Sequence, residues 1–349
     1  MRALLYDQFC GLLRVASVAE PAPPDGGVVI EVRAAGVCRS DWHGWQGHDA
    51  DIQTLPHVPG HEFAGVVAEI GANVTKWRPG DRVTMPFVAG CGACEECQSG
   101  AAQVCPRQFQ PGFTGWGAFA ERVAVRFADF NLVPLDETLS FDVAASLGCR
   151  TATAYRAVAL QGAVGPEQWV AVHGCGGVGL AAIMIAAALG ARPIAVDVQP
   201  GALAMARQFG AAATLNGAEL DDVPAAIEEL TDGGAHVSLD CLGGSATASN
   251  SLLCLRRCGR HVQVGLLAGG DFRPRLPWER VIAYELTAVG SHGLAAADYG
   301  PLLQMVADGT LPLGELITRR ITLSESAAAL QQMTAGSAPG VAVITDFTG

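Results

Sequence analysis

The chain has 349 residues, a length at which about two domains are expected. Half of its residues are hydrophobic, enough for folded cores, and its net charge of −12 argues against nucleic acid or an anionic membrane as a partner. No apolar run is long enough to span a bilayer, and the N-terminal segment has no secretory signal. We therefore expect a cytoplasmic protein, in whose reducing environment clustered cysteines are more often metal ligands than disulfides.

The N-terminal part, to about residue 150, is expected to be rich in short β-strands. Val28–Ala34 and Gly65–Ile70 are runs rich in β-branched residues, and the Pro/Gly-rich stretches Pro21–Pro24 and Pro79–Asp81 mark turns beside them. This composition predicts a β-rich domain over residues 1–150.

The middle of the chain, residues 151–289, alternates strand-like and helix-like segments. The expected strands are Trp169–Gly174, Pro193–Val198, Ala213–Asn216, Val237–Leu242, Arg260–Leu266 and Leu286–Ser291. The expected helices are Gly179–Leu189, Ala202–Phe209 and Pro224–Thr231. This alternation predicts parallel βαβ units, and therefore an α/β fold with a doubly wound parallel sheet.

After about residue 290 the pattern changes again. Two helical stretches, Tyr299–Ala307 and Leu323–Met333, precede a strand-like segment, Val341–Ile344. The sequence contains no internal repeat and no low-complexity linker.

Four cysteines form the most specific local motif, Cys91, Cys94, Cys97 and Cys105. Two successive C-x-x-C steps and a fourth cysteine a short loop later can close a tetrahedral, all-thiolate zinc site. Such closed sites are structural, so this cluster predicts a zinc ion that holds the loop together and takes no part in catalysis.

A glycine-rich loop follows the first strand of the middle region. It reads Gly174-Cys175-Gly176-Gly177-Val178-Gly179, a G-x-G-x-x-G pattern between an expected strand and an expected helix. In such a loop the glycines allow a tight turn, a close approach of a pyrophosphate and close packing of helix on strand. Asp197 ends the next strand, where a carboxylate accepts hydrogen bonds from ribose hydroxyls and repels a 2′-phosphate. The pattern therefore predicts a dinucleotide site that prefers NAD to NADP.

Three further residues, Cys38, His61 and Cys149, could form an open zinc site. Two thiolates and one imidazole would leave a fourth position for water or substrate, as at a catalytic zinc. These residues are too far apart in the sequence for their spacing to show that they are close in space. The residue types alone therefore do not establish that they form one site.

Five features, in chain order, resemble the zinc-dependent medium-chain alcohol dehydrogenase family. They are the segment Cys38–His43, the triplet Gly60-His61-Glu62, the four-cysteine lobe, the pair Gly148-Cys149 and the loop Gly174–Gly179. The resemblance covers essentially the whole chain. It implies a GroES-like catalytic domain over residues 1–150, completed by 290–349, and a Rossmann-type NAD-binding domain over 151–289.

The resemblance also implies two zinc ions per chain. The catalytic zinc would be bound by Cys38, His61 and Cys149, and the structural zinc by Cys91, Cys94, Cys97 and Cys105. Asp41 would orient the ligating histidine from outside the ligand sphere, and Glu62 would assist ligand exchange at the catalytic ion.

Further residues of the same segments would serve proton transfer, coenzyme and substrate. Ser40 would take the proton of the substrate and His43 would release it to solvent. Arg39 would contact the coenzyme pyrophosphate, together with the loop residues Gly174, Gly176, Gly177, Val178 and Gly179. The expected substrate pocket is lined by Phe87, Trp42, Trp116 and Leu266. One departure from the family is that Gly340 is followed by Val341, where many members have a pyrophosphate-binding arginine.

The implied reaction is reversible hydride transfer between a primary or secondary alcohol and NAD, with an aldehyde or ketone as the product. Alternatives are another zinc-dependent dehydrogenase of a polyol, threonine or aldehyde adduct, and an NADP-linked carbonyl reductase. A zinc-free quinone or enoyl reductase conflicts with two complete ligand sets, and a zinc-ribbon binding module leaves Cys38, His61 and Cys149 unexplained. The short segment between Cys105 and Cys149 resembles microbial members, so a homo-oligomer is expected, a tetramer rather than a dimer.

Overall fold

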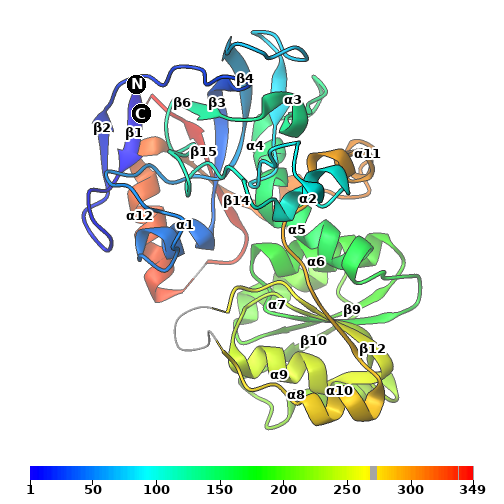
Figure 1. Ribbon diagram of the computed structural model, residues 1–349. Coiled ribbons are helices and arrows are strands. Elements are labelled where there is room, and N and C mark those ends of the chain that lie inside the picture. Colours follow the sequence, from blue (N-terminus) through cyan, green and yellow to red (C-terminus); the bar gives the residue numbers. More distant parts are fainter. Residues whose placement is uncertain (268–272, 337, 349) are drawn as a thin grey trace. The chain divides into compact units, whose positions relative to one another are not determined.

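The computed structural model describes residues 1–267, 273–336 and 338–348. These residues form two compact units, which are described below one at a time (Figure 1). Unit 1 consists of Met1–Ala152, Gly293–Asp308 and Pro312–Gly349, and unit 2 of Thr153–His292 and Gly309–Leu311. Among the described residues no helix has the length and apolar character needed to cross a membrane.

Unit 1 is built on a mixed, seven-stranded sheet and a two-stranded ribbon of β1 (Arg2–Leu5) and β2 (Arg14–Ser17). The sheet has the order β14–β15–β3–β4–β5–β7, and β6 also pairs with β3. Its strands are β3 (Val28–Val37), β4 (Glu62–Ile70), β5 (Arg82–Thr84), β6 (Arg122–Val125), β7 (Val133–Pro134), β14 (Ile317–Thr322) and β15 (Val341–Asp346). Strand β15 runs antiparallel to β3, so the C-terminal tail is part of the same sheet as the N-terminal strands.

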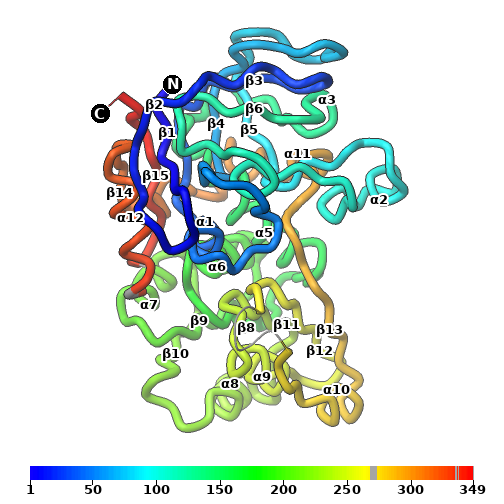
Figure 2. Tube along the Cα trace, turned by 60° about the vertical axis from the view of Figure 1, so that its left-hand side comes forward, coloured from blue at the N-terminus to red at the C-terminus, as the bar shows by residue number. Residues whose placement is uncertain are grey.

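The core of unit 1 lies around β3 and includes the fully buried side chains of Ile30, Phe63 and Phe119. Helices α1 (Arg39–Trp45) and α4 (Phe141–Ala145) follow the strands, and α11 (Tyr299–Ala307) and α12 (Ser326–Gln332) belong to the tail. The two chain ends lie side by side, where Nη1 of Arg2 donates to the carbonyl of Thr348 at 2.6 Å (Figure 1, Figure 2).

Unit 2 is a six-stranded, all-parallel sheet with the order β10–β9–β8–β11–β12–β13. Helices α6 and α7 pack together, and α8, α9 and α10 pack together, so that helices cover both faces (Figure 1). The strands are β8 (Trp169–His173), β9 (Arg192–Asp197), β10 (Ala213–Asn216), β11 (Ala235–Asp240), β12 (Leu255–Gln263) and β13 (Thr287–Gly290). The helices are α6 (Gly177–Ala188), α7 (Pro200–Gln208), α8 (Val223–Thr231), α9 (Ser245–Leu253) and α10 (Trp278–Tyr284). Since β8 lies next to both β9 and β11, the strand order reverses there, as in Rossmann folds. The predicted α/β fold class is confirmed.

From β8 onward, two α-helices and one strand of the described residues were not predicted from the sequence. Helix α9 is rich in Ser, Thr and Asn, which are poor helix formers, and it is stabilised by the buried side chains of Ala248 and Leu252. Helix α10 and strand β14 were also missed, although Trp278, Val281 and Ile282 of α10 have the i, i+3, i+4 spacing of an apolar helix face. Strand β12 begins five residues before the predicted Arg260, because its first half carries exposed side chains and a positive φ at Cys258.

The parallel sheet of unit 2 contains a buried histidine at the end of β8, which makes acid stability testable. Burial lowers the pKa of His173 to about 4, which the charge of Asp240 only partly offsets. His173 therefore binds a proton near pH 6.5 in the unfolded chain but only near pH 4 in the folded chain. We expect stability to fall as pH drops through this window, by on the order of 3 kcal/mol from this group alone.

The measurement is urea unfolding of the wild type and His173→Gln at pH 7 and pH 5. The variant should lose less free energy of unfolding between the two pH values than the wild type, because it lacks the titrating imidazole. If the wild type and the variant lost the same free energy of unfolding between pH 7 and pH 5, His173 would not be the cause of the pH dependence.

Candidate metal centres and glycine-rich loop

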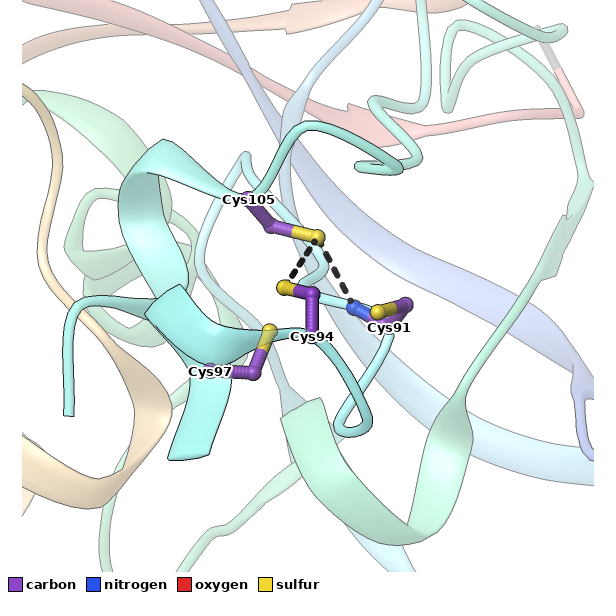
Figure 3. A group of neighbouring side chains, drawn as sticks. All are labelled: Cys91, Cys94, Cys97 and Cys105. Carbon is purple, nitrogen blue, oxygen red and sulfur yellow. Dashed lines mark hydrogen bonds between the residues drawn. The ribbon is translucent and has the colours of Figure 1, made fainter. Parts of the chain in front are cut away.

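The four-cysteine lobe closes on itself in unit 1 (Figure 3). Sγ of Cys94 lies 3.6 Å from Sγ of Cys105, and the four sulfurs all lie within 4.8 Å of one another. Tetrahedral zinc with bonds of about 2.3 Å places its sulfurs about 3.8 Å apart, so the spacing fits this ion. Backbone N–H groups of Cys91 and Arg107 each donate to Sγ of Cys105 at 3.3 Å, which stabilises negative charge on that sulfur.

A second group of ligand atoms comes from distant parts of unit 1. Cys38, His61, Glu62 and Cys149 are all buried, and their ligand atoms lie within 4.8 Å of one another. The antiparallel pairing of β3 with β4 explains two of them, because Gly36 lies opposite Glu62, which brings the residues just after β3 beside those just before β4. Cys149 arrives from η2 (Leu147–Thr151), a π-helical turn after α4.

Asp41 fixes the geometry of this group. Its Oδ1 accepts from the backbone N–H of Gly60 and from Nδ1 of His61, both at 2.9 Å, and its Oδ2 accepts from the backbone N–H of Cys38 at 3.0 Å. Nδ1 of His61 is thus held as the donor, and the ring's Nε2 is left free to coordinate. That Nε2 is buried without a hydrogen-bond partner among the described residues, as expected of a metal ligand.

The two buried thiols shift each other's pKa in opposite directions. A hydrogen bond from Cys149 lowers the pKa of Cys38 well below its ordinary value, and the same hydrogen bond raises the pKa of Cys149 well above its own. Burial of an anion beside an unpartnered imidazole nitrogen is unfavourable unless a cation completes the site. The donor set, two sulfurs and one imidazole, suits zinc.

Glu62 is paired with Arg150, which the sequence reasoning missed. Oε1 of Glu62 accepts from the backbone N–H of Arg150 at 3.2 Å, Oε2 pairs with its guanidinium, and the guanidinium also donates to the carbonyl of Val37 at 3.1 Å. Burial raises the pKa of Glu62 to about 7, against the opposing effect of Arg150. A side chain at Gly36 would overlap both partners, since its Cβ would lie 2.4 Å from Oε2 of Glu62. The one available signal was that Arg150 directly follows a predicted ligand.

This pair supports a stability prediction. Arg150→Met should destabilise the protein by about 3–5 kcal/mol, because it leaves a buried carboxylate without its partner. The double variant Arg150→Met/Glu62→Gln should recover part of that loss. The matched control is Arg192→Met, which breaks an exposed pair with Glu167 and should cost at most about 1 kcal/mol. Urea unfolding at constant zinc concentration measures all three, and a loss for Arg150→Met no larger than the control would contradict the prediction.

The predicted relay residues, Ser40 and His43, and the predicted pyrophosphate contact Arg39 lie on α1, which begins immediately after Cys38. Ser40 and His43 are half-buried and three residues apart, so they lie on neighbouring positions of one helix face. The guanidinium of Arg39 stacks 4.0 Å from the ring of Trp42 and donates to the carbonyl of Met333. Nε1 of Trp42 donates to Oγ1 of Thr334 at 3.0 Å, so both side chains tie α1 to the end of α12.

The four predicted pocket residues are placed differently from one another. The ring of Phe87 lies 6.1 Å from that of His61, edge to face, and Phe113, which was not predicted, lies closer at 5.0 Å. Nε1 of Trp116 donates to the carbonyl of Pro56 at 3.0 Å, and Trp116 lines a surface hollow of about 210 Å³ with Phe109 and Arg126. Leu266 belongs to unit 2 and is 57% exposed. Of the four, Phe87 is the one whose ring contact with a candidate ligand is described.

The glycine-rich loop of unit 2 joins β8 to α6. Gly174 has φ +90°, and a Cβ at Gly179 would lie 1.9 Å from the carbonyl oxygen of Gly174, so both positions require glycine. A Cβ at Gly176 would meet nothing within 4 Å, which leaves open space over the first turn of α6. No side chain caps that helix, so its N-terminal N–H groups are available to an anion.

Asp197 links this loop to the end of β9. Its Oδ2 accepts from the backbone N–H of Cys175 at 2.7 Å and its Oδ1 from that of Gln199 at 2.8 Å. The carboxylate therefore stays half-buried at the carboxyl edge of the sheet, next to the glycines. This is the edge at which doubly wound sheets bind their ligands.

Two family models match the chain in sequence. The alcohol dehydrogenase GroES-like domain matches residues 24–137, and the zinc-binding dehydrogenase domain matches residues 177–308. Together the two matches cover more than half of the chain. The first contains the candidate ligands Cys38 and His61, and the second contains Gly179 of the glycine-rich loop. The chain belongs to the zinc-dependent medium-chain alcohol dehydrogenase family.

The individual relatives of the chain are named as dehydrogenases of alcohols or of a polyol. An alcohol dehydrogenase of Geobacillus stearothermophilus is 36% identical over 76% of this chain and 78% of its own length. A sorbitol dehydrogenase of Halalkalibacterium halodurans is 31% identical over 97% of both chains. The solved structure of alcohol dehydrogenase TADH from Thermus sp. ATN1 superposes with a TM-score of 0.89 at 31% identity, covering 99% of this chain and 100% of that one. Medium-chain dehydrogenases of alcohols and of a polyol are thus similarly related to the protein.

Proposed function

We propose that this protein is an alcohol dehydrogenase that holds two zinc ions per chain and transfers hydride reversibly between a primary or secondary alcohol and NAD. The observation that carries the proposal is the buried set of Cys38, His61 and Cys149, with an unpartnered Nε2 on the imidazole. Three such ligands leave one position for a substrate oxygen, which is the composition of a catalytic zinc site. The second ion belongs to the closed lobe of four cysteines.

The chemistry is divided between the bound groups and the residues of the chain. Zinc, when bound, supplies a Lewis acid that lowers the pKa of the substrate hydroxyl, and NAD supplies the hydride acceptor. Asp41 keeps His61 in the coordinating tautomer, and the Glu62–Arg150 pair holds a carboxylate beside the ligands for exchange. Ser40 accepts the proton of the alcohol, and His43 passes it outward along α1.

The coenzyme is bound by unit 2 in this proposal. The loop Gly174–Gly179 receives the pyrophosphate, with its open position at Gly176 and the N-terminus of α6. Asp197 accepts the ribose hydroxyls and repels a 2′-phosphate, which favours NAD over NADP. Arg39 of unit 1 is a further candidate for the pyrophosphate in this proposal, and its guanidinium donates to the carbonyl of Met333 in this structure.

A polyol dehydrogenase is the second candidate, because a sorbitol dehydrogenase is related over almost the full length. Two features of the site favour a simple alcohol. The third ligand position holds Cys149, and the neighbouring carboxylate of Glu62 is already paired with Arg150. The ring of Phe87 beside His61 adds an apolar wall, which suits an alkyl substituent better than a chain of hydroxyls.

The test is a panel of steady-state rates on primary and secondary alcohols, ketones, sorbitol and threonine, each with NAD and NADP. We expect kcat/KM to be highest for a simple alcohol or ketone and higher with NAD than with NADP. A preference for sorbitol or threonine would favour the second candidate. No NAD- or NADP-linked activity on any member of the panel would contradict the proposal.

We also propose that the protein is a cytoplasmic homo-oligomer, a tetramer rather than a dimer. The edge strand β13 of unit 2 has no buried residue, and Trp278 and Ile282 on the neighbouring helix α10 are 57% and 78% exposed. An open strand edge beside exposed apolar side chains is typical of a surface that a second copy covers. Light scattering on the purified protein measures the mass directly, and a monomer of 36.0 kDa would contradict the proposal.

A further inference from the structure

Two imidazole rings meet at the C-terminal end of α1. Nδ1 of His43 lies 3.0 Å from Nδ1 of His48, with ring centroids 5.3 Å apart. The backbone holds them there, because the N–H of His48 donates to the carbonyl of His43 at 3.0 Å. The turn between them needs Gly47, which has φ +75° and packs against the ring of Phe9. The contact is therefore built into the turn that ends the helix.

The two rings differ in their surroundings. His43 is half-buried, whereas His48 is exposed to solvent. Trp42 stands edge-on to both, with centroids 4.9 Å and 5.7 Å away. Burial lowers the pKa of His43, and the charges of Arg39 and His48 lower it further, against smaller opposing effects of Cys38 and Asp49. A proton that reaches His43 is thus disfavoured there and has an exposed acceptor in hydrogen-bond contact.

We propose that His48 accepts the proton that His43 passes outward, and that their shared hydrogen bond sets the tautomer and ring orientation of His43. The inference rests on the relay role of His43 in the proposed function and extends it by one residue. His48 acts through His43, so it is a positioning residue with an acceptor role and does not touch the substrate.

The proton balance closes within the pair. In the neutral pair, Nδ1–H of His43 donates to the lone pair on Nδ1 of His48. A proton arriving at Nε2 of His43 makes an imidazolium, and the Nδ1 proton then moves to Nδ1 of His48. His43 is left neutral with its proton on Nε2, and His48 releases its own Nε2 proton to water. Each transfer breaks one N–H bond and forms another, and no group is oxidised or reduced.

A double-mutant cycle on the zinc-loaded enzyme with NAD tests the coupling. The variants are His43→Gln, His48→Gln and the double variant, and the readout is the pH profile of kcat/KM for the best alcohol. We expect His48→Gln to lower kcat/KM by about three- to tenfold below neutral pH, where release of the proton is hardest, and less above it. In the His43→Gln background, His48→Gln should have no further effect. Added imidazole should restore the His48→Gln rate, because an external base replaces the missing acceptor.

A second readout does not depend on turnover. In proton NMR titrations of the protein without coenzyme, His48→Gln should shift the midpoint of His43 upward, because a neighbouring positive charge is removed. An unchanged pH profile together with an unchanged midpoint would overturn the role of His48 while leaving the dehydrogenase activity established. Additive effects of the two substitutions would overturn it as well. An inactive wild type would overturn the proposed function and this inference together.

Discussion

Cys38→Ala should abolish alcohol oxidation while leaving the protein folded. The substitution removes one of three ligands from the buried group, and a site of one thiol and one imidazole binds zinc too weakly to keep it. We expect the zinc content to fall from two ions to one per chain and kcat/KM to fall by at least about a thousandfold, the size expected when several kcal/mol of metal stabilisation is lost. Steady-state kinetics, metal analysis and circular dichroism on the same sample measure the three quantities.

The matched control for Cys38→Ala is Cys10→Ala. Cys10 is exposed and belongs to neither group of ligand atoms, so its loss should leave both zinc ions and the activity in place. If Cys38→Ala kept two zinc ions and near wild-type activity, the assignment of the catalytic site would be wrong.

Cys94→Ala should act on stability and leave the chemistry intact. Cys94 is the N-cap of α2 (Glu95–Gln98), and its sulfur lies 3.6 Å from that of Cys105, a contact drawn in Figure 3. A closed four-thiolate site contributes its binding free energy to folding, so removing one ligand should lower stability by on the order of 3–5 kcal/mol. The activity per folded molecule at low temperature should stay within about twofold of the wild type, because this lobe supplies no group to the reaction.

Thermal unfolding and the zinc content of the variant measure the effect of Cys94→Ala. Cys258→Ala provides the control, because Cys258 is exposed to solvent and lies in unit 2, outside both ligand groups. A Cys94→Ala protein that is as stable as the wild type but inactive would reverse the roles assigned to the two sites.

The parts of the site that could be predicted from the sequence are those whose geometry is local. The four cysteines of the lobe lie within fifteen residues, and the glycines of the coenzyme loop lie within six, so their spacing carries the geometry. The doubly wound sheet could also be predicted from the sequence, because alternating strands and helices are compatible with few other topologies. Cys38, His61 and Cys149 are too far apart for such an argument, and family resemblance alone placed them together.

The parts that were missed depend on contacts between distant segments. The role of Arg150 depends on Glu62, which lies 88 residues earlier, and this partner is known only once η2 is packed against β4. Phe113 reaches His61 from a glycine-rich loop that has no periodic pattern. Helix α9 is stabilised by tertiary packing despite its low intrinsic helix propensity, and the hydrogen bond between His43 and His48 depends on the turn that contains Gly47.

The central claim is that Cys38, His61 and Cys149 bind a zinc ion distinct from the one in the four-cysteine lobe. Anomalous diffraction from a crystal of the zinc-loaded protein, recorded on both sides of the zinc absorption edge, tests it most directly. The account predicts two peaks per chain, one among the four cysteines and one within about 2.3 Å of the sulfurs of Cys38 and Cys149 and close to Nε2 of His61. A single peak per chain, confined to the four-cysteine lobe, would contradict the account.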